Sequence, residues 1–479
     1  MTTRRTTLAI LGATILASLQ PLPLFAEEDA AAKAVEAAKA FAGTTINVAE
    51  EAGLMAMLGI NVTGPEWERL TGIKVKVSEL PYEELFTKQL LEHKAGSGAY
   101  DVLTIGHSWV ADLVLAGALE PLDPLIEKYG VKEEFDDIVP AFREGTMYQG
   151  ATYALAVDGD VHVLYYRKDI FEDPAMQEAF KAKYGYDLAP PTDYGKFNEV
   201  CQFITDQTGG KVYGAGLINT GYQHFFFGER FRLYGGKYFD EASMKAQINS
   251  EAGVRAVQEM VDALKCQPPG AATWGFGESL SALNSGEIAM TITWPPVARW
   301  AQGINADEQA LSWVPESTVV DKIGYALTPG GHPSLVPGIQ LALSSDSKNK
   351  DAAYLYMQWL TSKTESLKNV MRPIGLRDPF RYSHFDSPEF QALWPTAPNY
   401  LSVLREGDEK GYADFAVLET YKYTDTLARA VIAAIGGKDP KAALDEAAAQ
   451  WDAITKQVGV DRQREAYKAW ASRPSAYRM

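Results

Sequence analysis

Short apolar segments alternate with amphipathic segments of helical period through the region that begins near Thr44. Residues 45–49 and 101–105 are apolar runs, and residues 73–77 alternate apolar and polar side chains. Leucines and a phenylalanine recur at helical spacing after Pro81. Such alternation predicts an α/β fold with a mostly parallel sheet, because each helix returns the chain to the start of the next strand. The helices are expected over 55–70, from Pro81 onward and over 110–118.

The second half of the chain carries more of both patterns. Two extended runs, 153–157 and 161–166, lie on either side of Asp158-Gly159-Asp160. From residue 351 onward the sequence is mostly helical, with interruptions at proline-rich stretches. No internal repeat appears. Further strands are expected over 288–293 and 338–343, and further helices over 251–265 and 278–284.

The amino terminus has the three parts of a secretory signal peptide. An arginine pair precedes an apolar run from Leu8 to Leu19, and Ala26 precedes an acidic stretch. The run is shorter than the roughly 20 apolar residues of a spanning helix, so a membrane anchor is the less favoured alternative. We expect a signal peptide over 1–26 and a periplasmic protein. The arginine pair leaves general and twin-arginine export both open.

Residues 27–43 are alanine-rich and predict either a solvated helical extension or a partly ordered one. No cysteine lies near the cleavage position, so no lipid can be attached there. The chain's two cysteines, Cys201 and Cys266, fall on helices expected in one region. A disulfide and two buried thiols both remain open for them.

Composition and missing motifs exclude several classes of function. Asp and Glu total 62 against 45 Lys and Arg, a formal charge of −17, which disfavours a nucleic-acid partner. The sequence has no Gly-x-Ser-x-Gly elbow, no His-Glu-x-x-His, no Cys-x-x-Cys and no P-loop. We therefore expect no enzyme, no metal site and no cofactor.

Five motifs follow one another along the chain: TGIKV at 71–75, the segment 100–123, YYRKDIF at 165–171, SGEIAM at 285–290 and SKNKDAA at 347–353. They resemble, in the same order, segments of periplasmic sugar-binding proteins, and the ordered set covers most of residues 44–375. The chain thus resembles extracellular solute-binding proteins of the maltose-binding-protein type, which feed ABC transporters. The region 380–420 is longer and richer in aromatic residues than the corresponding region of that family.

The resemblance implies a two-lobed periplasmic binding protein fold, type II-like, with a ligand cleft between hinged lobes. Lobe one would hold 44–157 and 294–340, and lobe two 158–293 and 341–479. The implied function is high-affinity binding of a carbohydrate: a sugar, a polyol or an oligosaccharide. The implied partners are that small molecule and the permease subunits of an ABC importer in the inner membrane. We expect a monomer.

A carbohydrate site needs flat aromatics for the C–H faces, and carboxylates, amides or arginines for the hydroxyls. In open α/β sheets ligands lie beyond the carboxyl ends of the strands, so polar and aromatic residues just after strands are the first candidates. Solvated loops, turns and loop packing are the alternatives for them. This first group is Glu50, Glu51, His107, Ser108, Trp109, Asp158 and Asp160.

A second group of candidates matches other cleft segments of the family. Trp274 lies among glycines, where a core role is harder to explain, so it is the strongest stacking candidate. The run 222–227 matches an aromatic-bearing cleft loop, but its consecutive rings cannot all face one way. The second group is Tyr222, His224, Trp274, Phe276, Trp294, Gly338, Arg372 and Arg377.

Other ligands remain open. Acidic loops and aromatic rings suit an opine, a polyamine or another amine as well as a sugar. The adjacent Tyr165 and Tyr166 are a pair that can bind Fe(III), although the family match has them packing in a strand. A secreted glycoside hydrolase is the least favoured alternative, because 62 acidic residues make some suitable carboxylate pair inevitable.

Overall fold

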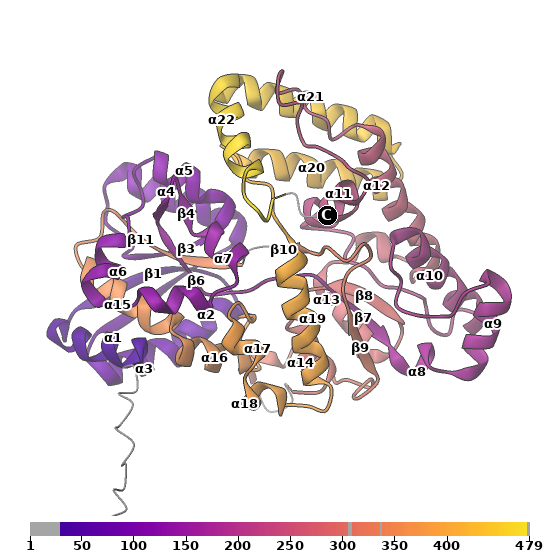
Figure 1. Cartoon of the computed structure of the whole chain (residues 1–479), viewed down its shortest axis with the longest axis horizontal. Helices are drawn as coiled ribbons and strands as arrows, with labels where there is room; N and C mark the ends of the chain where they lie inside the picture. Colours follow the sequence, from indigo (N-terminus) through magenta and orange to yellow (C-terminus); the bar gives the residue numbers. More distant parts are fainter. Residues whose placement is uncertain (1–28, 305–308, 336–337, 477–479) are drawn as a thin grey trace, which may run out of the picture.

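The computed structural model describes residues 29–304, 309–335 and 338–476. The expected signal peptide, residues 1–26, lies outside them. Figure 1 shows two α/β lobes side by side, one mainly purple and one magenta to pink, with the yellow carboxyl-terminal helices over the second. Among the described residues, none of the helices has both the length and the hydropathy of a membrane span.

The first lobe is built on a five-stranded sheet in the order β2-β1-β3-β11-β6. The first three strands are mutually parallel, as the alternating sequence pattern predicts. The strand β11 runs antiparallel between β3 and β6. The strands are β1 (Thr45–Glu51), β2 (Lys74–Leu80), β3 (Val102–Gly106), β6 (Ala154–Ala156) and β11 (Ile339–Leu343).

The second lobe has a smaller sheet in the order β8-β7-β9, and both of its pairings are antiparallel. The expectation of a mostly parallel sheet is wrong here, because both partners of β7 come from segments much later in the chain rather than from helical crossovers. Two short ladders complete the pairing, β4 with β5 and β10 with β12. The strands are β7 (Val163–Arg167), β8 (Met290–Thr293), β9 (Ile323–Ala326), β4 (Met147–Tyr148), β5 (Ala151–Thr152), β10 (Ser334–Leu335) and β12 (Tyr412–Ala413).

The pairing of strands places the lobe boundaries differently from the sequence. The strand β9 pairs with β7 in the second lobe, although 294–340 was assigned to lobe one. Conversely, β11 and the helix that follows it join the first lobe, although 341–479 was assigned to lobe two. The chain therefore passes between lobes after β6, returns before β11 and leaves again beyond residue 371. Hydrophobic patterning marks β11 as a strand but does not say which sheet it joins, and β9 was not among the expected strands.

Helices cover both sheets. In the first lobe they are α1 (Ala30–Ala38), α2 (Leu54–Leu58), α3 (Gly64–Thr71), α4 (Tyr82–Ala95), α5 (Val110–Leu115), α6 (Asp123–Tyr129), α7 (Pro140–Gly145), α15 (Lys350–Thr361) and α16 (Lys363–Met371). The remaining ones are α8 (Lys168–Phe171), α9 (Pro174–Tyr184), α10 (Tyr194–Thr208), α11 (Gln223–Leu233), α12 (Glu251–Ala263), α13 (Phe276–Ser285), α14 (Val297–Ala301), α17 (Tyr382–Phe385), α18 (Pro388–Gln391), α19 (Ala397–Lys410), α20 (Thr420–Ile435), α21 (Pro440–Val458) and α22 (Val460–Ala471).

In two of the sequence motifs the glycine caps the carboxyl end of a helix. Gly72 in TGIKV ends α3 with φ 75°, and Gly286 in SGEIAM ends α13 with φ 79°. A side chain disfavours this left-handed conformation, and glycine adopts it freely. Each glycine thereby turns the chain from a helix toward the strand that follows.

The alanine-rich extension is packed and not solvated. Ala30, Ala31, Ala34 and Ala38 are buried on one face of α1. This face lies in one hydrophobic cluster with α15, which Figure 1 shows beside it. The small side chains let the two helices approach closely, so the expectation of a solvated extension is wrong.

The cysteines are paired. Cys201 on α10 forms a disulfide with Cys266, which lies in the short 3-10 helix η5 (Leu264–Cys266). The bond fastens α10 to the end of α12 inside the core of the second lobe. Of the two alternatives left open by the sequence, the disulfide is the one present.

Candidate functional site

Aromatic rings from both lobes meet between them. Tyr82 at the start of α4 lies 5.2 Å, between ring centroids, from Trp109 in the first lobe. Across the gap its ring is 6.4 Å from that of Tyr222, which in turn lies 5.5 Å from Trp294. We call these four residues the interlobe aromatic cluster. The rings contact one another, so the two lobes are closed over this point.

Position after a strand explains how these rings converge. Tyr82 follows β2, Trp109 lies in the 3-10 helix η3 (His107–Trp109) directly after β3, and Trp294 follows β8. Tyr222 precedes α11 and holds a left-handed φ of 55°. The strands β2 and β3 both run parallel to β1, so their carboxyl ends lie at one edge of the first sheet. Trp294 reaches the cluster from the carboxyl end of β8 in the antiparallel second sheet.

Carboxylates surround the aromatic cluster. Burial and then the negative charges of Glu51, Asp414 and Asp160 raise the pKa of Tyr82 well above its usual value. These acids come from β1, from the end of β12 and from the segment between β6 and β7. The cluster therefore offers flat hydrophobic faces next to hydroxyl acceptors, which is the combination that a polyhydroxylated or a cationic small molecule can use.

Two histidines near the cluster are held neutral. Burial, followed by the positive charge of Arg473, lowers the pKa of His107 to about 3. Its Nε2 lies 3.4 Å from the carbonyl oxygen of Asp414, across the lobe boundary. Burial likewise lowers the pKa of His224 to about 3, with a smaller contribution from His162. Neutral imidazoles can still donate one hydrogen bond and accept another.

Two expected site residues neutralise each other instead. Nη2 of Arg377 lies 3.2 Å from Oε2 of Glu50, and both side chains are buried. The other oxygen of Glu50 accepts a hydrogen bond from the hydroxyl of Thr104 at 2.8 Å. Because these contacts use the charges of both residues, the pair holds β1 to the crossing segment rather than presenting either group to a solute.

Trp274 stands apart from the interlobe aromatic cluster, and its stacking role stays a prediction. Its ring lies over Gly216, where an added Cβ would be 2.9 Å from Cζ3, and it packs on the second-lobe core. No ring contact joins it to the interlobe aromatic cluster among the described residues. The glycine after it has a local role, since Gly275 caps α13 and its N–H donates to Glu278 at 2.9 Å.

Other expected residues lie behind or beside the cluster. Phe276 backs Trp294 at 6.1 Å, and Ser108 lies between His107 and Trp109 in η3. Arg372 ends α16, and its Nε donates to Asn369 at 3.4 Å. The run 222–227 is not a loop, because α11 begins at Gln223 and buries the phenylalanines after His224.

Two expected residues meet where the chain crosses between the lobes. A Cβ on Gly338 would lie 2.5 Å from the carbonyl oxygen of Asp158, so only glycine allows this approach. Asp158 is buried, and its Oδ1 accepts hydrogen bonds from the N–H groups of Gly159 at 2.9 Å and Asp378 at 2.7 Å. Asp158-Gly159-Asp160 is therefore part of a crossing segment and not a surface turn.

The two tyrosines considered for Fe(III) point apart. The hydroxyl of Tyr165 donates to the carbonyl oxygen of Trp294 at 2.9 Å. The ring of Tyr166 lies on the other face of β7, 5.0 Å from that of Phe171. Neighbouring residues in a strand face opposite sides, so this pair cannot hold one ion together.

Sequence reasoning missed Tyr82 and Asp414. The signal for Tyr82 was present, because it follows the strand 74–80 as the other candidates follow theirs. Asp414 lies in the region 380–420 that exceeds the family pattern, and nothing local marks it. A small pocket away from the cluster is lined by Tyr354, Gln358 and Arg381, among others.

Comparisons with known proteins give one consistent family. The family model described as "Bacterial extracellular solute-binding protein" matches residues 49–365. A probable amino-acid ABC transporter periplasmic-binding protein of Sinorhizobium fredii is 28% identical over 411 residues, 83% of this chain and 88% of the relative. A mannitol-binding protein of Pseudomonas aeruginosa is 28% identical over 271 residues, 56% of this chain and 57% of the relative.

The fold has solved counterparts. The crystal structure of an ABC transporter solute-binding protein from Agrobacterium vitis with bound D-mannitol superposes with a TM-score of 0.69 at 24% identity. The superposition covers 87% of this chain and 99% of that one. The two-lobed arrangement of Figure 1 is thus the arrangement of solute-binding proteins.

Proposed function

The chain belongs to the family of bacterial extracellular solute-binding proteins, and on that premise we propose that it is the high-affinity binding component of an ABC importer for a small sugar or polyol. The family serves transport and is not an enzyme family, and no catalytic step is assigned to this chain. It works in the periplasm as a monomer, after removal of residues 1–26, and passes its solute to permease subunits in the inner membrane.

The interlobe aromatic cluster is the observation that carries this proposal. Its rings supply the faces against which C–H groups stack, while Glu51, Asp160 and Asp414 accept hydrogen bonds from hydroxyls. The mannitol named for the Pseudomonas relative and for the Agrobacterium structure supports a polyol.

Binding works through closure of the lobes. A solute that contacts Tyr82 and Trp109 on one lobe and Tyr222 and Trp294 on the other lowers the free energy of the closed state relative to the open one. The chain segments that cross between the lobes act as the hinge. The permease then recognises the closed, loaded form through surfaces of both lobes.

An amino acid or amine is the second candidate. The name of the Sinorhizobium relative supports it, and so does the excess of acids around Tyr82. A cationic nitrogen can lie against aromatic faces and pair with a carboxylate. The two candidates differ in the charge of the solute, which makes them easy to separate by experiment.

A thermal-shift and calorimetric panel tests the proposal. We expect mannitol or a related polyol to raise the Tm with increasing concentration, because a solute that binds only folded protein stabilises it by mass action. Maltose tests the oligosaccharide class, and putrescine with neutral and basic amino acids tests the second candidate. If only the amines raised the Tm, the solute would be an amine and not a polyol. If none of these solutes raised the Tm, the proposed solute class would be contradicted.

Paired variants locate the site. We expect Tyr222→Ala to weaken solute binding by about tenfold or more, as truncation of a central aromatic anchor does. Trp274→Ala is the control, because that ring lies on the second-lobe core; its affinity should stay within about twofold of wild type. If Trp274→Ala weakened solute binding more than Tyr222→Ala does, the solute site would lie at the glycine-flanked loop around Trp274.

A further inference from the structure

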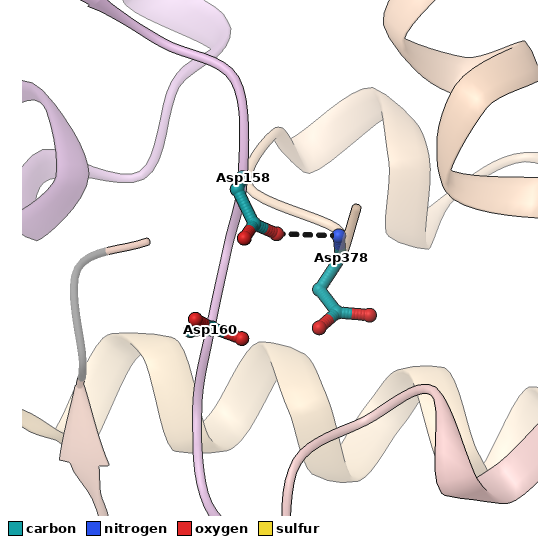
Figure 2. Close-up of side chains that lie close together, drawn as sticks. All are labelled: Asp158, Asp160 and Asp378. Carbon is teal, nitrogen blue, oxygen red and sulfur yellow. Dashed lines mark hydrogen bonds between the residues drawn. The ribbon is translucent and has the colours of Figure 1, made fainter. Parts of the chain in front are cut away.

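Three aspartates gather where two crossing segments pass each other. Asp158 and Asp160 belong to the segment between β6 and β7, and Asp378 belongs to the segment beyond α16. One carboxylate oxygen from each lies within 4.8 Å of the others. Figure 2 shows the three side chains converging on one space between the two segments. We call these residues the hinge carboxylates.

The first of them is fixed in orientation. Oδ1 of Asp158 accepts hydrogen bonds from the N–H groups of Gly159 and Asp378, and Figure 2 shows the second of these bonds. Its Oδ2 is buried and receives no donor. The carboxylate is therefore anchored through one oxygen and presents the other to its neighbours, which is how ligating carboxylates are usually held.

Asp378 provides an observation separate from proximity. Its side chain is fully buried, and apart from the carboxyl of Asp160 neither of its oxygens has a hydrogen-bond partner among the described residues. The polar group that it faces is the carboxyl of Asp160. Buried carboxylates without a donor are rare because their desolvation is uncompensated, so such a group directed into an acidic cluster indicates a missing positive partner.

The neighbouring arginines supply only part of that positive charge. Arg377 is paired with Glu50, although its charge also acts on Asp158 and Asp378. Arg299 lies within electrostatic reach of Asp378, but its guanidinium donates to backbone carbonyls, including that of Gly375 at 2.7 Å. Against three carboxylates it leaves an excess of two negative charges. Asp408, also buried and without a donor, adds to the excess.

We propose that the hinge carboxylates bind one Ca²⁺ ion that joins the two crossing segments. Calcium takes oxygen ligands at about 2.3–2.6 Å, so two oxygens on opposite sides of one ion are about 5 Å apart, in line with the spacing here. The ligand oxygens are Oδ2 of Asp158 and the carboxyl oxygens of Asp378 and Asp160, whose mutual hydrogen bond the ion would replace. Asp160 is only half-buried, and water completes the coordination on its side.

The site favours calcium over magnesium. Magnesium requires near-regular octahedral geometry and keeps several waters, which a space enclosed by buried side chains does not provide. The ion would also hold Asp160 beside Tyr82, so the hinge and the interlobe aromatic cluster share one residue. The calcium site is independent of the solute class, because the argument uses no contact with a solute.

Direct metal analysis on the full mature chain tests the site without any solute present. We expect protein stripped with EDTA and then dialysed against CaCl₂ to retain one calcium per chain by mass spectrometry, and its Tm to rise with calcium concentration. Absence of retained calcium would overturn the site, and the buried carboxyls would then carry protons. Tighter retention of Mg²⁺ than of Ca²⁺ would overturn the choice of ion.

Matched variants separate binding from folding. Asp378→Asn keeps the shape of the side chain and removes its charge, and we expect it to weaken calcium binding by about tenfold or more relative to wild type. Asp112→Asn is the control, since Asp112 is another largely buried aspartate, whose two oxygens accept from the N–H of Glu419; it should retain calcium like wild type. If Asp378→Asn does not fold, the half-buried Asp160→Asn replaces it. Wild-type calcium affinity in a folded variant would overturn the assignment.

Discussion

At the scale of single residues, the position of a polar side chain after a strand predicts its region but not its partner. Glu51, His107, Trp109 and Asp160 were selected from the sequence on this rule, and the structure has them in or beside the interlobe aromatic cluster. Glu50 satisfies the same rule and is instead neutralised by Arg377, a residue that comes from the far end of the chain. Such a pairing has no local sequence signal.

The buried neutral state of His107 makes stability depend on pH. Its folded pKa of about 3 lies below the unfolded value of about 6.5, so the unfolded chain takes up the proton first. The stabilisation is complete above the unfolded pKa and is lost as the pH falls toward 3. Between pH 7 and pH 5, this one residue should cost about 2 kcal/mol of unfolding free energy.

We expect His107→Gln to remove that part of the acid sensitivity. Urea unfolding of wild type and variant at pH 7 and pH 5 gives the difference, which isolates His107 from the other titrating groups. Asp112, whose pKa burial raises to about 6, changes stability in the opposite direction but equally in both proteins. An identical loss of stability in the two proteins on acidification would contradict the buried neutral histidine.

At the scale of elements, hydrophobic patterning predicted most strands and helices, because periodicity and end signals are local. The glycines at 72 and 286 end helices where the motifs indicated. The pattern gave wrong predictions where contacts with distant parts of the chain determine whether a segment is buried or helical. The alanine-rich α1 is buried only because α15 lies against it, and the aromatic run after residue 222 is a helix because the core of the second lobe receives its phenylalanines.

The crossing segments are packed too closely for a side chain at Gly159. A Cβ there would meet the carbonyl oxygen of Pro379 at 2.0 Å and Cβ of Phe380 at 3.0 Å. We expect Gly159→Ala to lower the unfolding free energy by about 1–3 kcal/mol, as overpacking does. Chemical denaturation measures the change.

Gly277→Ala serves as the control for this substitution. A Cβ at Gly277 meets nothing within 4 Å, and the residue lies in α13, where alanine is the better helix former by up to about 1 kcal/mol. The control should equal or exceed the stability of wild type. Equal stability of the two alanine variants would show that the crossing segments can separate without cost.

At the scale of the whole molecule, the sequence motifs led to the two-lobed fold, and the solved relatives have it. The division of the chain between the lobes could not be predicted. Each of β9 and β11 is a short buried run, and membership of a sheet is decided by which edge is open, not by the run itself.

Contact between Tyr82 and Tyr222 marks the closed form. We expect solution scattering to give a larger radius of gyration without solute than with it, since nothing then bridges the lobes. The measurement uses whichever solute the calorimetric panel identifies, at saturating concentration. A radius that does not fall on saturation would mean that capture occurs without a hinge motion.

The place of β11 in the first sheet has a consequence for how the protein is made. The strand β6 has β11 as its neighbour in that sheet, and α1 packs on the helix that follows β11. The first lobe therefore cannot be completed until the ribosome has synthesised most of the polypeptide. Until then, the unpaired edges of its strands stay exposed. Because the first lobe starts earliest but needs residues that are synthesised late, we expect the nascent chain to require a chaperone that prevents aggregation until β11 and α15 have been made.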